Sequence, residues 1–253
     1  FHAWKIFSPL VDPSLFRIMY DVDGIHTLNK YSYRIFSSIF RDLKIFFIPN
    51  GVDLNPYARN ISKKLHSEHF KVLWTGRLEY DKGADILIKL LLYIRKKKSV
   101  FHSLKFYICG SGSYAPIVRK LCSKYKGSFA YLGFVDRDRL LRMYAEAHLF
   151  ISPSRMDGMP LRLLESNVAG TPVIASAIPG NADVVRLCKS GILINGWDAT
   201  QYLDAIQLFY NFWKTSPDAY EHLCLRILER TIQFFSWDTV CEKISLMFKS
   251  VIN

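Results

Sequence analysis

The segment 154-SRMDGMPLRLLESNVAGTPVIAS-176 decides the fold, because a turn, a helix and a strand follow one another in it without a break. A Gly-Met-Pro turn precedes a helical apolar pattern at 160–170 that stops at Gly170, and a short apolar run at 171–176 comes directly after it. Asp157 and Glu165 lie eight positions apart, one before the helix and one inside it. We therefore expect a helix–strand unit with carboxylates at its entrance.

The same alternation continues on both sides of this segment. Further strands are predicted at 71–76, 104–110, 129–134, 149–154 and 191–194, and helices at 84–97, 114–125, 137–147 and 199–213, with a turn and short helix at 180–185. Continuous apolar strands that alternate with helices predict an α/β fold, a Rossmann-like parallel sheet with helices on both faces. Ligands of such sheets bind outside the carboxyl ends of the strands.

The first 55 residues show a shorter version of this pattern, with strands at 24–28 and 44–52 and a helix at 29–40. These elements are too few to enclose a core, so we expect 1–55 to be the end of a preceding α/β domain plus a linker. The main domain then spans 56–235, and 236–253 is a closing amphipathic helix that starts near Ser236 or Asp238. The chain opens with "FHAWKIF" and no initiator Met, which predicts a fragment of a longer protein.

Composition excludes several classes of protein. Half of the 253 residues are apolar and 22% are charged, as in a globular protein. No apolar run approaches the roughly 20 residues that span a bilayer. The five cysteines show no CxxC spacing and the seven histidines no HExxH, so we expect neither a disulfide framework nor a metal site, and a reducing, cytoplasmic location.

The net charge of +12 fits nucleic acid, an anionic membrane surface or a phosphorylated small substrate. The run at 95–98, "RKKK", ends a predicted helix, where cations suit the helix dipole and a solvated terminus explains them. Neither an RNA-binding aromatic strand nor a basic groove-binding helix is present, so we expect no nucleic-acid partner.

Two loops contain basic residues or glycines at strand ends. In "TGRLEYDKGAD" (75–85), Arg77 and Lys82 stand beside a helix start, which predicts an anion site; two solvent-facing cations are the alternative. In "CGSGSY" (109–114), the glycines allow a close backbone approach. A dinucleotide fingerprint is excluded because position 115 is Ala and 129–134 holds no acid, and a plain tight turn is sufficient.

The opening segment has the same chemistry. Pro160 is predicted in the first turn of the helix, and Gly158 permits close approach to its free N–H groups, which suit a phosphate. Glu165 lies too far inside the helix to cap it. If Glu165 faces the cleft it would bind hydroxyl groups; the alternative is an exposed glutamate on an ordinary amphipathic helix.

The ordered set of motifs resembles the nucleotide-sugar-binding half of GT-B glycosyltransferases, specifically the retaining family 4. The matching pieces cover roughly 20–253 and are "IPNGVD" (48–53), "GRLEYDKGAD" (76–85), "CGSGS" (109–113), "YLGFV" (131–135), 150–176, "IPGNADVV" (178–185), "GILI" (191–194) with Asp198, and "FSWD" (235–238). The resemblance implies that 1–55 ends an acceptor-binding domain and that 56–235 binds a nucleotide-sugar.

By this resemblance Arg77 and Lys82 bind the donor diphosphate and stabilise the leaving group without a metal or other cofactor. Glu165 holds the ribose hydroxyls, and Asp157 faces the transferred sugar and its phosphate. The implied catalytic residues are Arg77, Lys82, Asp157 and Glu165; the implied donor-binding residues are Gly76, Gly112, Phe134, Val135, Gly158, Met159, Pro160 and Leu161.

The chain departs from the family pattern at two places. Asp157 stands where the family has Glu, which shortens the reach of the acid, and Asn167–Val168 replace small residues. The expected partners are a nucleotide-sugar donor and a saccharide or lipid-linked acceptor, with peripheral contact to the anionic inner face of the membrane. Two alternatives stay open: a catalytically silent nucleotide-sugar-binding module, and another GT-B enzyme such as an epimerase, which the paired acids and cations disfavour.

Overall fold

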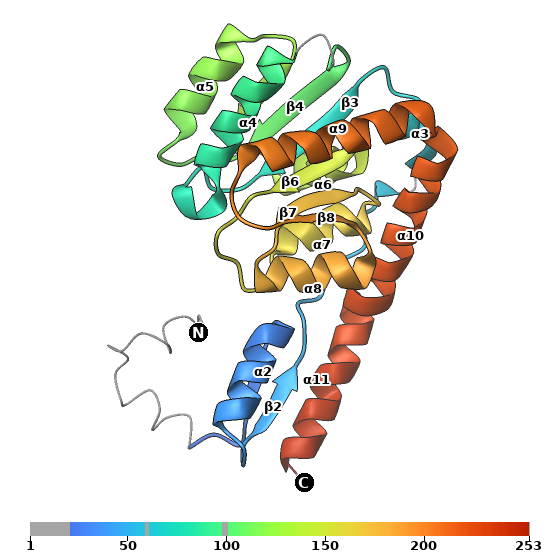
Figure 1. The fold of residues 1–253 in the computed structure, drawn as a ribbon. Helices are drawn as coiled ribbons and strands as arrows, with labels where there is room; N and C mark the ends of the chain where they lie inside the picture. Colours follow the sequence, from blue (N-terminus) through green and yellow to red (C-terminus); the bar gives the residue numbers. More distant parts are fainter. Residues whose placement is uncertain (1–20, 59–60, 98–100, 253) are drawn as a thin grey trace.

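The structure, a computed structural model, describes residues 21–58, 61–97 and 101–252, and its main feature is a six-stranded parallel sheet (Figure 1). The strands run in the order β5-β4-β3-β6-β7-β8, and they are β3 (Phe70–Thr75), β4 (Leu104–Cys109), β5 (Phe129–Gly133), β6 (Leu149–Ser152), β7 (Val173–Ser176) and β8 (Gly191–Ile194). The order reverses between β3 and β6, so the crevice at their carboxyl ends is the expected ligand position. The predicted Rossmann-like sheet is confirmed.

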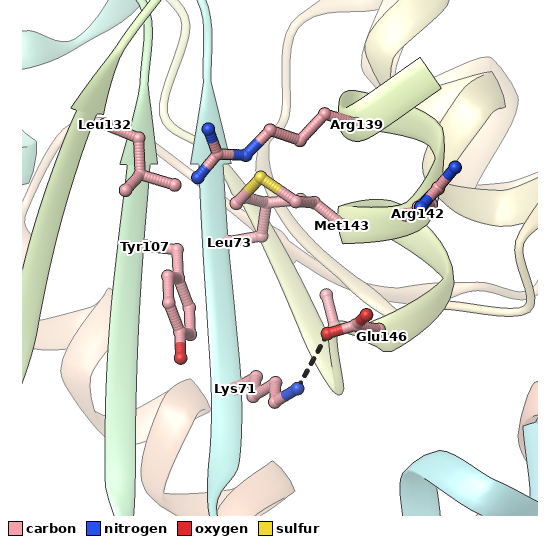
Figure 2. Close-up of a pocket in the computed structure, with 9 residues that line it drawn as sticks. Lys71, Leu73, Tyr107, Leu132, Arg139, Arg142, Met143 and Glu146 are labelled. Atoms are coloured by element: carbon pink, nitrogen blue, oxygen red, sulfur yellow. Dashed lines mark hydrogen bonds and ion pairs between the residues drawn. The ribbon is translucent and has the colours of Figure 1, made fainter. Parts of the chain in front are cut away.

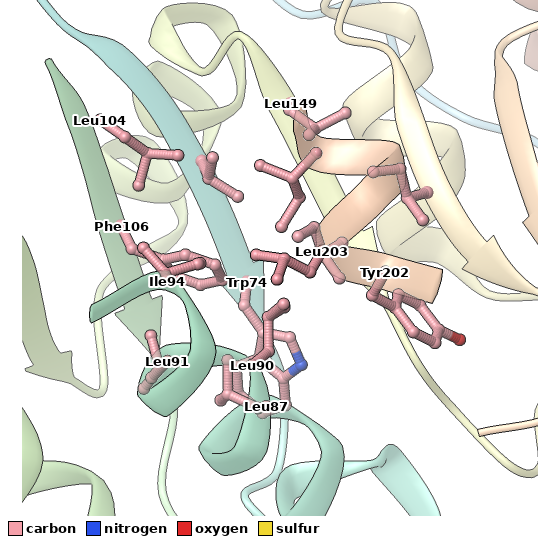
Figure 3. Close-up of a cluster of buried hydrophobic side chains, with 14 of the residues drawn as sticks. Trp74, Leu87, Leu90, Leu91, Ile94, Leu104, Phe106, Leu149, Tyr202 and Leu203 are labelled. Atoms are coloured by element: carbon pink, nitrogen blue, oxygen red, sulfur yellow. The ribbon is translucent and has the colours of Figure 1, made fainter. Parts of the chain in front are cut away.

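Helices cover both faces of this sheet, as the continuous apolar strands require. One face carries α4 (Ala84–Lys96), α5 (Ala115–Lys124) and α9 (Ala199–Thr215). The other carries α6 (Arg137–Glu146), α7 (Leu161–Val168), α8 (Pro179–Cys188) and the C-terminal part of α10 (Pro217–Phe235), which contributes Phe235. Alternate side chains of β3 serve the two cores: Trp74 packs against Leu87 and Leu90 of α4 (Figure 3), and Leu73 packs on the opposite face.

A smaller unit lies below this domain in Figure 1 and consists of two parallel strands and one helix. Its elements are β1 (Gly24–Thr27), α2 (Lys30–Ile39) and β2 (Lys44–Phe47), and Asn29 caps α2 by accepting the Ser32 N–H at 2.8 Å. The C-terminal helix α11 (Trp237–Ile252) runs beside it, and the Lys44 ammonium donates to the Ser250 carbonyl. Residues 1–20 of the predicted 1–55 unit lie outside the described residues, as does Lys98 of the basic run.

The structure corrects four predictions of secondary structure. Helix α10 was not predicted, although its buried positions recur at helical spacing: Tyr220, Cys224, Ile227, Thr231 and Phe235. The turn and short helix at 180–185 are a ten-residue helix, α8. The strand at 44–52 ends at 47, and beyond it only Val52 forms a bridge, with Ser236.

The fourth correction concerns Pro160. It precedes α7 as its N-cap, with an extended ψ of 110°, rather than standing in the first helical turn. A short helix α3 (Ile61–Leu65) also lies within the linker-proximal part of the main domain, where no element was predicted.

Candidate functional site

Two loops meet at the carboxyl ends of β3 and β6. The first contains the 3-10 turn η3 (Tyr80–Lys82), and the second follows β6. They touch so closely that a Cβ on Gly83 would lie 2.2 Å from the Pro153 carbonyl oxygen. The Arg155 side chain also forms a bidentate ion pair with Asp85 at 2.7 and 2.8 Å, which joins the second loop to the first turn of α4. Residues 70 positions apart in the sequence are therefore held in contact at the switch point of the sheet.

This contact produces a cluster of three charged side chains. The Lys82 ammonium lies 3.1 Å from Oδ2 of Asp157, and Nη2 of Arg162 lies 3.2 Å from the same oxygen. The three side chains are only 17%, 18% and 20% exposed, so water screens their charges less than it would on an open surface. Two cations on one carboxylate leave a net positive charge at the carboxyl ends of the strands.

Arg77 lies at the solvent side of this cluster. Its guanidinium pairs with Asp81 at 2.9 Å and the side chain is 68% exposed, whereas Lys82, 3.8 Å from the same carboxylate, is largely buried. The structure thus brings Arg77, Lys82 and Asp157 into one chain of ion pairs, with Arg77 at the mouth and Lys82 inside.

Glu165 lies one turn further along α7 and is only 12% exposed. Its Oε1 accepts from Nη1 of Arg137 at 2.9 Å. The buried Tyr144 hydroxyl lies 3.0 Å from Oγ1 of Thr75 at the end of β3; burial raises the pKa of Tyr144, and the nearby Glu165 carboxylate raises it further. Glu165 therefore lies against the end of the sheet and not on a solvent-facing helix surface.

The turns after β4 and β5 lie along the same edge. The Gly110 N–H donates to the Gly133 carbonyl at 2.6 Å, which holds the two turns together. Gly112 packs against the backbone of the η3 loop, where Ser113 donates to Glu79 from its N–H at 2.8 Å and its hydroxyl at 2.6 Å, and these bonds lower the pKa of Glu79. Phe134 is 87% exposed and Val135 is half-buried.

The entrance to α7 is held from the side of the smaller unit. The Asn29 side-chain amide donates to the Gly158 carbonyl at 3.0 Å, and that of Asn50 donates to the Met159 carbonyl at 3.2 Å. Met159 and Pro160 are buried, and Leu161 is half exposed. The predicted donor-binding residues at this entrance thus present backbone rather than polar side chains.

Comparison with known proteins identifies the family. Residues 58–222, more than half of the chain, match the family described as Glycosyl transferases group 1. The chain belongs to this family. The match confirms the predicted membership of the chain in the group 1 glycosyltransferases.

Several members and structural neighbours of these group 1 glycosyltransferases are similar to the chain. The "Uncharacterized glycosyltransferase MJ1607" of Methanocaldococcus jannaschii is 23% identical over 91% of this chain and 60% of its own length. The GDP-mannose-dependent alpha-(1-6)-phosphatidylinositol monomannoside mannosyltransferase of Mycobacterium tuberculosis is 28% identical over 81% of this chain and 56% of its own length. The chain therefore spans little more than half the length of these curated relatives.

Solved structures show the same fold at low sequence identity. Sucrose-phosphate synthase from Thermosynechococcus elongatus matches with a TM-score of 0.76 at 20% identity, over 99% of this chain and 65% of that structure. HepE of Anabaena, solved in complex with UDP-glucose, matches with a TM-score of 0.70 at 18% identity, over 90% of this chain and 64% of its own. These similarities support the assignment of the chain to the GT-B fold.

Two arginines of this group 1 chain belong to the site and were missed from the sequence. Arg162 binds Asp157, and its Nη1 donates to the Thr75 carbonyl at 2.6 Å. One signal could have found it, since residues three apart on a helix share a face and Arg162 stands three before Glu165. Arg137 had no such signal, because its partner Glu165 lies 28 positions away in the sequence.

Gly76 makes the position of Arg162 feasible. Its φ of +143° is one that favours glycine, and a Cβ at this position would lie 1.9 Å from Nη1 of Arg162. The Gly-Arg pair after β3 therefore serves two purposes in this chain: Arg77 extends to the mouth of the site, and Gly76 makes room for a second guanidinium.

A separate pocket of about 260 Å³ lies beside the switch point, between α6 and the faces of β3 to β5 (Figure 2). Tyr107, Leu132 and Met143 form its apolar lining, and the ion pair of Lys71 with Glu146 closes one end. It contains none of the predicted site residues. Across the described residues there is no group of three or more His, Cys, Asp or Glu placed to hold a metal ion, and no helix there combines the length and apolarity needed to cross a membrane.

Proposed function

We propose that this chain supplies the donor site of a glycosyltransferase that moves a sugar from a nucleoside-diphosphate sugar to an acceptor with retention of anomeric configuration. The observation that carries the proposal is the convergence of Lys82, Asp157 and Arg162 at the switch point of the sheet, with Glu165 one turn away. Retention is inferred from the resemblance to family 4.

In the proposed reaction the bond between the anomeric carbon and the phosphate oxygen breaks, and the nucleoside diphosphate leaves with the electron pair. The acceptor hydroxyl oxygen bonds to the anomeric carbon from the same face, and its proton passes to the oxygen of the departing diphosphate. Negative charge grows on the leaving diphosphate, so the cations of Arg77 and Lys82 stabilise this step without a metal. The N–H groups at the start of α7 add to the attraction for phosphate.

Lys82 pairs with Asp157, so a bound diphosphate has to share or displace that contact. Arg162 keeps Asp157 compensated when Lys82 turns to the phosphate, because Arg162 is anchored separately on the Thr75 carbonyl. Asp157 then faces the sugar together with the backbone of Gly158–Leu161. This arrangement suits the shorter acid, since Arg162 fixes its direction.

Glu165 is proposed to accept hydrogen bonds from the ribose hydroxyl groups. A carboxylate accepts several hydrogen bonds, so hydroxyl groups can join Arg137 on it. The base is proposed to lie at the turn of Gly112 and the turn of Phe134–Val135, which the backbone bond between Gly110 and Gly133 holds together.

The proposed partners follow from the relatives. HepE was solved with UDP-glucose, and the mycobacterial relative is named for GDP-mannose and a phosphatidylinositol acceptor. We propose a nucleotide-sugar donor and a saccharide or lipid-linked acceptor for this chain. Of its five cysteines four are buried and none is bonded to another, which supports a reducing, cytoplasmic location, and the net charge of +12 supports peripheral contact with the inner face of the membrane.

A thermal-shift titration with UDP, GDP and ADP tests the donor site. At a concentration about a hundred times Kd, the matching nucleotide stabilises the fold by about 3 kcal/mol, which raises Tm by about 5–10 °C for a chain of this size. We expect Arg77→Ala and Glu165→Ala to lose this shift. The matched controls Arg226→Ala and Glu229→Ala change exposed residues of α10 and should keep it.

Equal shifts in the wild-type chain and in both site variants would contradict the site assignment, and the absence of any shift would contradict donor binding. Transfer is tested separately, by NMR of the anomeric proton of the product. A β-linked product from an α-linked donor would contradict retention. A nucleotide shift without turnover across an acceptor panel would favour the silent nucleotide-sugar-binding module.

A further inference from the structure

One stretch of fifty residues carries almost the entire charge excess of the chain. The stretch 86–135 contains ten lysine and arginine residues and no aspartate or glutamate over fifty positions. Elsewhere the cations outnumber the acids by only two, since the net charge is +12. The ten are Lys89, Arg95, Lys96, Lys97, Lys98, Lys105, Arg119, Lys120, Lys124 and Lys126.

The fold gathers this charge on the outer side of α4 and α5, at the upper left of Figure 1. Eight of the nine described cations of the stretch are exposed, and Lys105 is half-buried. Not one of these nine forms an ion pair with a carboxylate, although the other ion pairs of the described residues use most of the cations around the donor site. The surface is therefore strongly positive, and Asp198, beside Lys89, is an acid at its edge.

The C-terminal ends of the two helices form one continuous patch. The Arg95 guanidinium lies over the ring of Tyr125, 4.5 Å from its centroid, and the Lys124 ammonium lies 5.7 Å from the same centroid. Lys96, Lys97 and Lys126 flank this contact in the sequence. We name the surface formed by Arg95, Lys96, Lys97, Arg119, Lys120, Lys124 and Lys126 the α4–α5 basic face.

Apolar side chains border the basic face. Leu92 of α4 is 36% exposed, Ile117 of α5 is 50% exposed, and Trp197 is 45% exposed. Trp197 lines a groove of about 460 Å³ together with Lys89, Arg95, Lys96 and the acidic Asp198. Cations that alternate with exposed aliphatic and indole groups suit the boundary between lipid headgroups and acyl chains.

We propose that the α4–α5 basic face docks this protein on an anionic lipid surface. Charge complementarity selects anionic headgroups, and each lysine or arginine near such a surface contributes to binding. The exposed aliphatic side chains of Leu92 and Ile117 favour lipid over nucleic acid, because phosphate-backbone binding uses cations and polar groups rather than aliphatic ones. The proposal assigns a surface to the peripheral contact and does not depend on the donor site.

The position of the face is compatible with a working donor site. Helices α4 and α5 begin at the carboxyl edge of the sheet, where Arg77 and Lys82 lie, and end at the opposite edge, where Arg95, Lys97 and Lys124 cluster. A protein docked through these helix ends keeps the switch-point crevice open to the donor and to a saccharide acceptor in solution.

Vesicle flotation with the whole chain tests the proposal. The probes are phosphatidylcholine vesicles, and the same vesicles with about a third phosphatidylserine. The test variant is Lys96→Gln/Lys120→Gln/Lys124→Gln, and its control is Lys214→Gln/Arg226→Gln/Lys249→Gln, which removes the same charge from exposed positions of α9, α10 and α11. Both triples should keep the wild-type Tm and nucleotide shift.

We expect wild-type and control chains to bind only the anionic vesicles, with binding that weakens as salt rises. The test triple should lower the partition coefficient by about a hundredfold, at about 1 kcal/mol per cation. A Leu92→Ser/Ile117→Ser variant should lose the part of binding that persists in high salt. If the test and control triple variants lose vesicle binding equally, the binding depends only on the net charge of the chain, and the assignment to the α4–α5 basic face is wrong.

Two other outcomes would also overturn it. If wild-type chain fails to float with anionic vesicles, no docking surface for lipid exists. If it ignores vesicles but binds a double-stranded or single-stranded oligonucleotide through the same three lysines, the partner of the face is nucleic acid. Donor binding can fail or succeed independently, because it is read from the nucleotide shift.

Discussion

Substitution of Gly76 by alanine tests the geometry of the site most directly. The new Cβ would lie 1.9 Å from Nη1 of Arg162, so the guanidinium has to retreat by at least about 1 Å to reach a tolerable contact. Its bonds to the Thr75 carbonyl, at 2.6 Å, and to Asp157, at 3.2 Å, would then exceed hydrogen-bond range. We expect the variant to lose both bonds.

The magnitude follows from two contributions. The positive φ of Gly76 adds about 1–2 kcal/mol of backbone strain for any residue with a Cβ. Loss of hydrogen bonds from a charged donor adds about 1.5–3 kcal/mol. The Gly76→Ala variant should therefore lose about 3–5 kcal/mol of unfolding free energy, and Arg162→Met, which removes the bonds but not the glycine, about 1.5–3 kcal/mol.

The decisive measurement is the double variant, in urea or guanidinium denaturation read at fixed m-value. With methionine at position 162 the added Cβ no longer meets a guanidinium, so Gly76→Ala should lower the unfolding free energy only by the backbone strain. The coupling energy between the two substitutions should therefore be about 2 kcal/mol. Gly127→Ala is the control for strain alone, since Gly127 has a φ of +95° and nothing within 4 Å of an added Cβ. If the losses of unfolding free energy from the two single substitutions add up to that of the double variant within about 0.5 kcal/mol, the contact between position 76 and Arg162 is refuted.

Three further outcomes are expected from the core and the cysteines. The buried His148 accepts the Lys71 N–H on Nδ1, and burial lowers the pKa of His148 to about 3, whereas the unfolded chain takes up this proton near pH 6.5. The unfolding free energy should therefore be fully retained above pH 6.5 and fall by roughly 1 kcal/mol per pH unit below it. A His148→Asn variant with the same pH slope in urea titrations would contradict this. Of the five cysteines only Cys241 is exposed, so one thiol should react rapidly with a thiol reagent in the native chain and five after unfolding; a second fast thiol would be inconsistent with the burial. Leu90→Ala should lower the unfolding free energy by about 2–5 kcal/mol because Leu90 is buried against the sheet. Leu92→Ala, two positions along the same helix, should change it by no more than about 0.5 kcal/mol. Similar losses in the two variants would show that the buried face of α4 is misassigned.

Much of the fold was readable from the sequence because the deciding signals are local. The apolar runs of 71–76 and 149–154 are strands, and the helical spacing of 84–97 is α4, because backbone geometry repeats every two or 3.6 residues. Helix α10 was predictable from the same signal, since its buried positions keep the helical period. The order of motifs likewise identified the family before any comparison.

The arrangement of the site was decided only in three dimensions. The sequence predicted Lys82 and Asp157 as members of one site, but not that they form an ion pair, nor that Arg162 and Arg137 are the other cations on Asp157 and Glu165. An ion pair depends on which loops the strand order brings together, and the reversal between β3 and β6 joins segments more than seventy positions apart. Periodicity is a property of neighbouring residues, whereas the pairing of Lys82 with Asp157 and of Arg137 with Glu165 is a property of distance in the folded chain, and no local pattern encodes that distance.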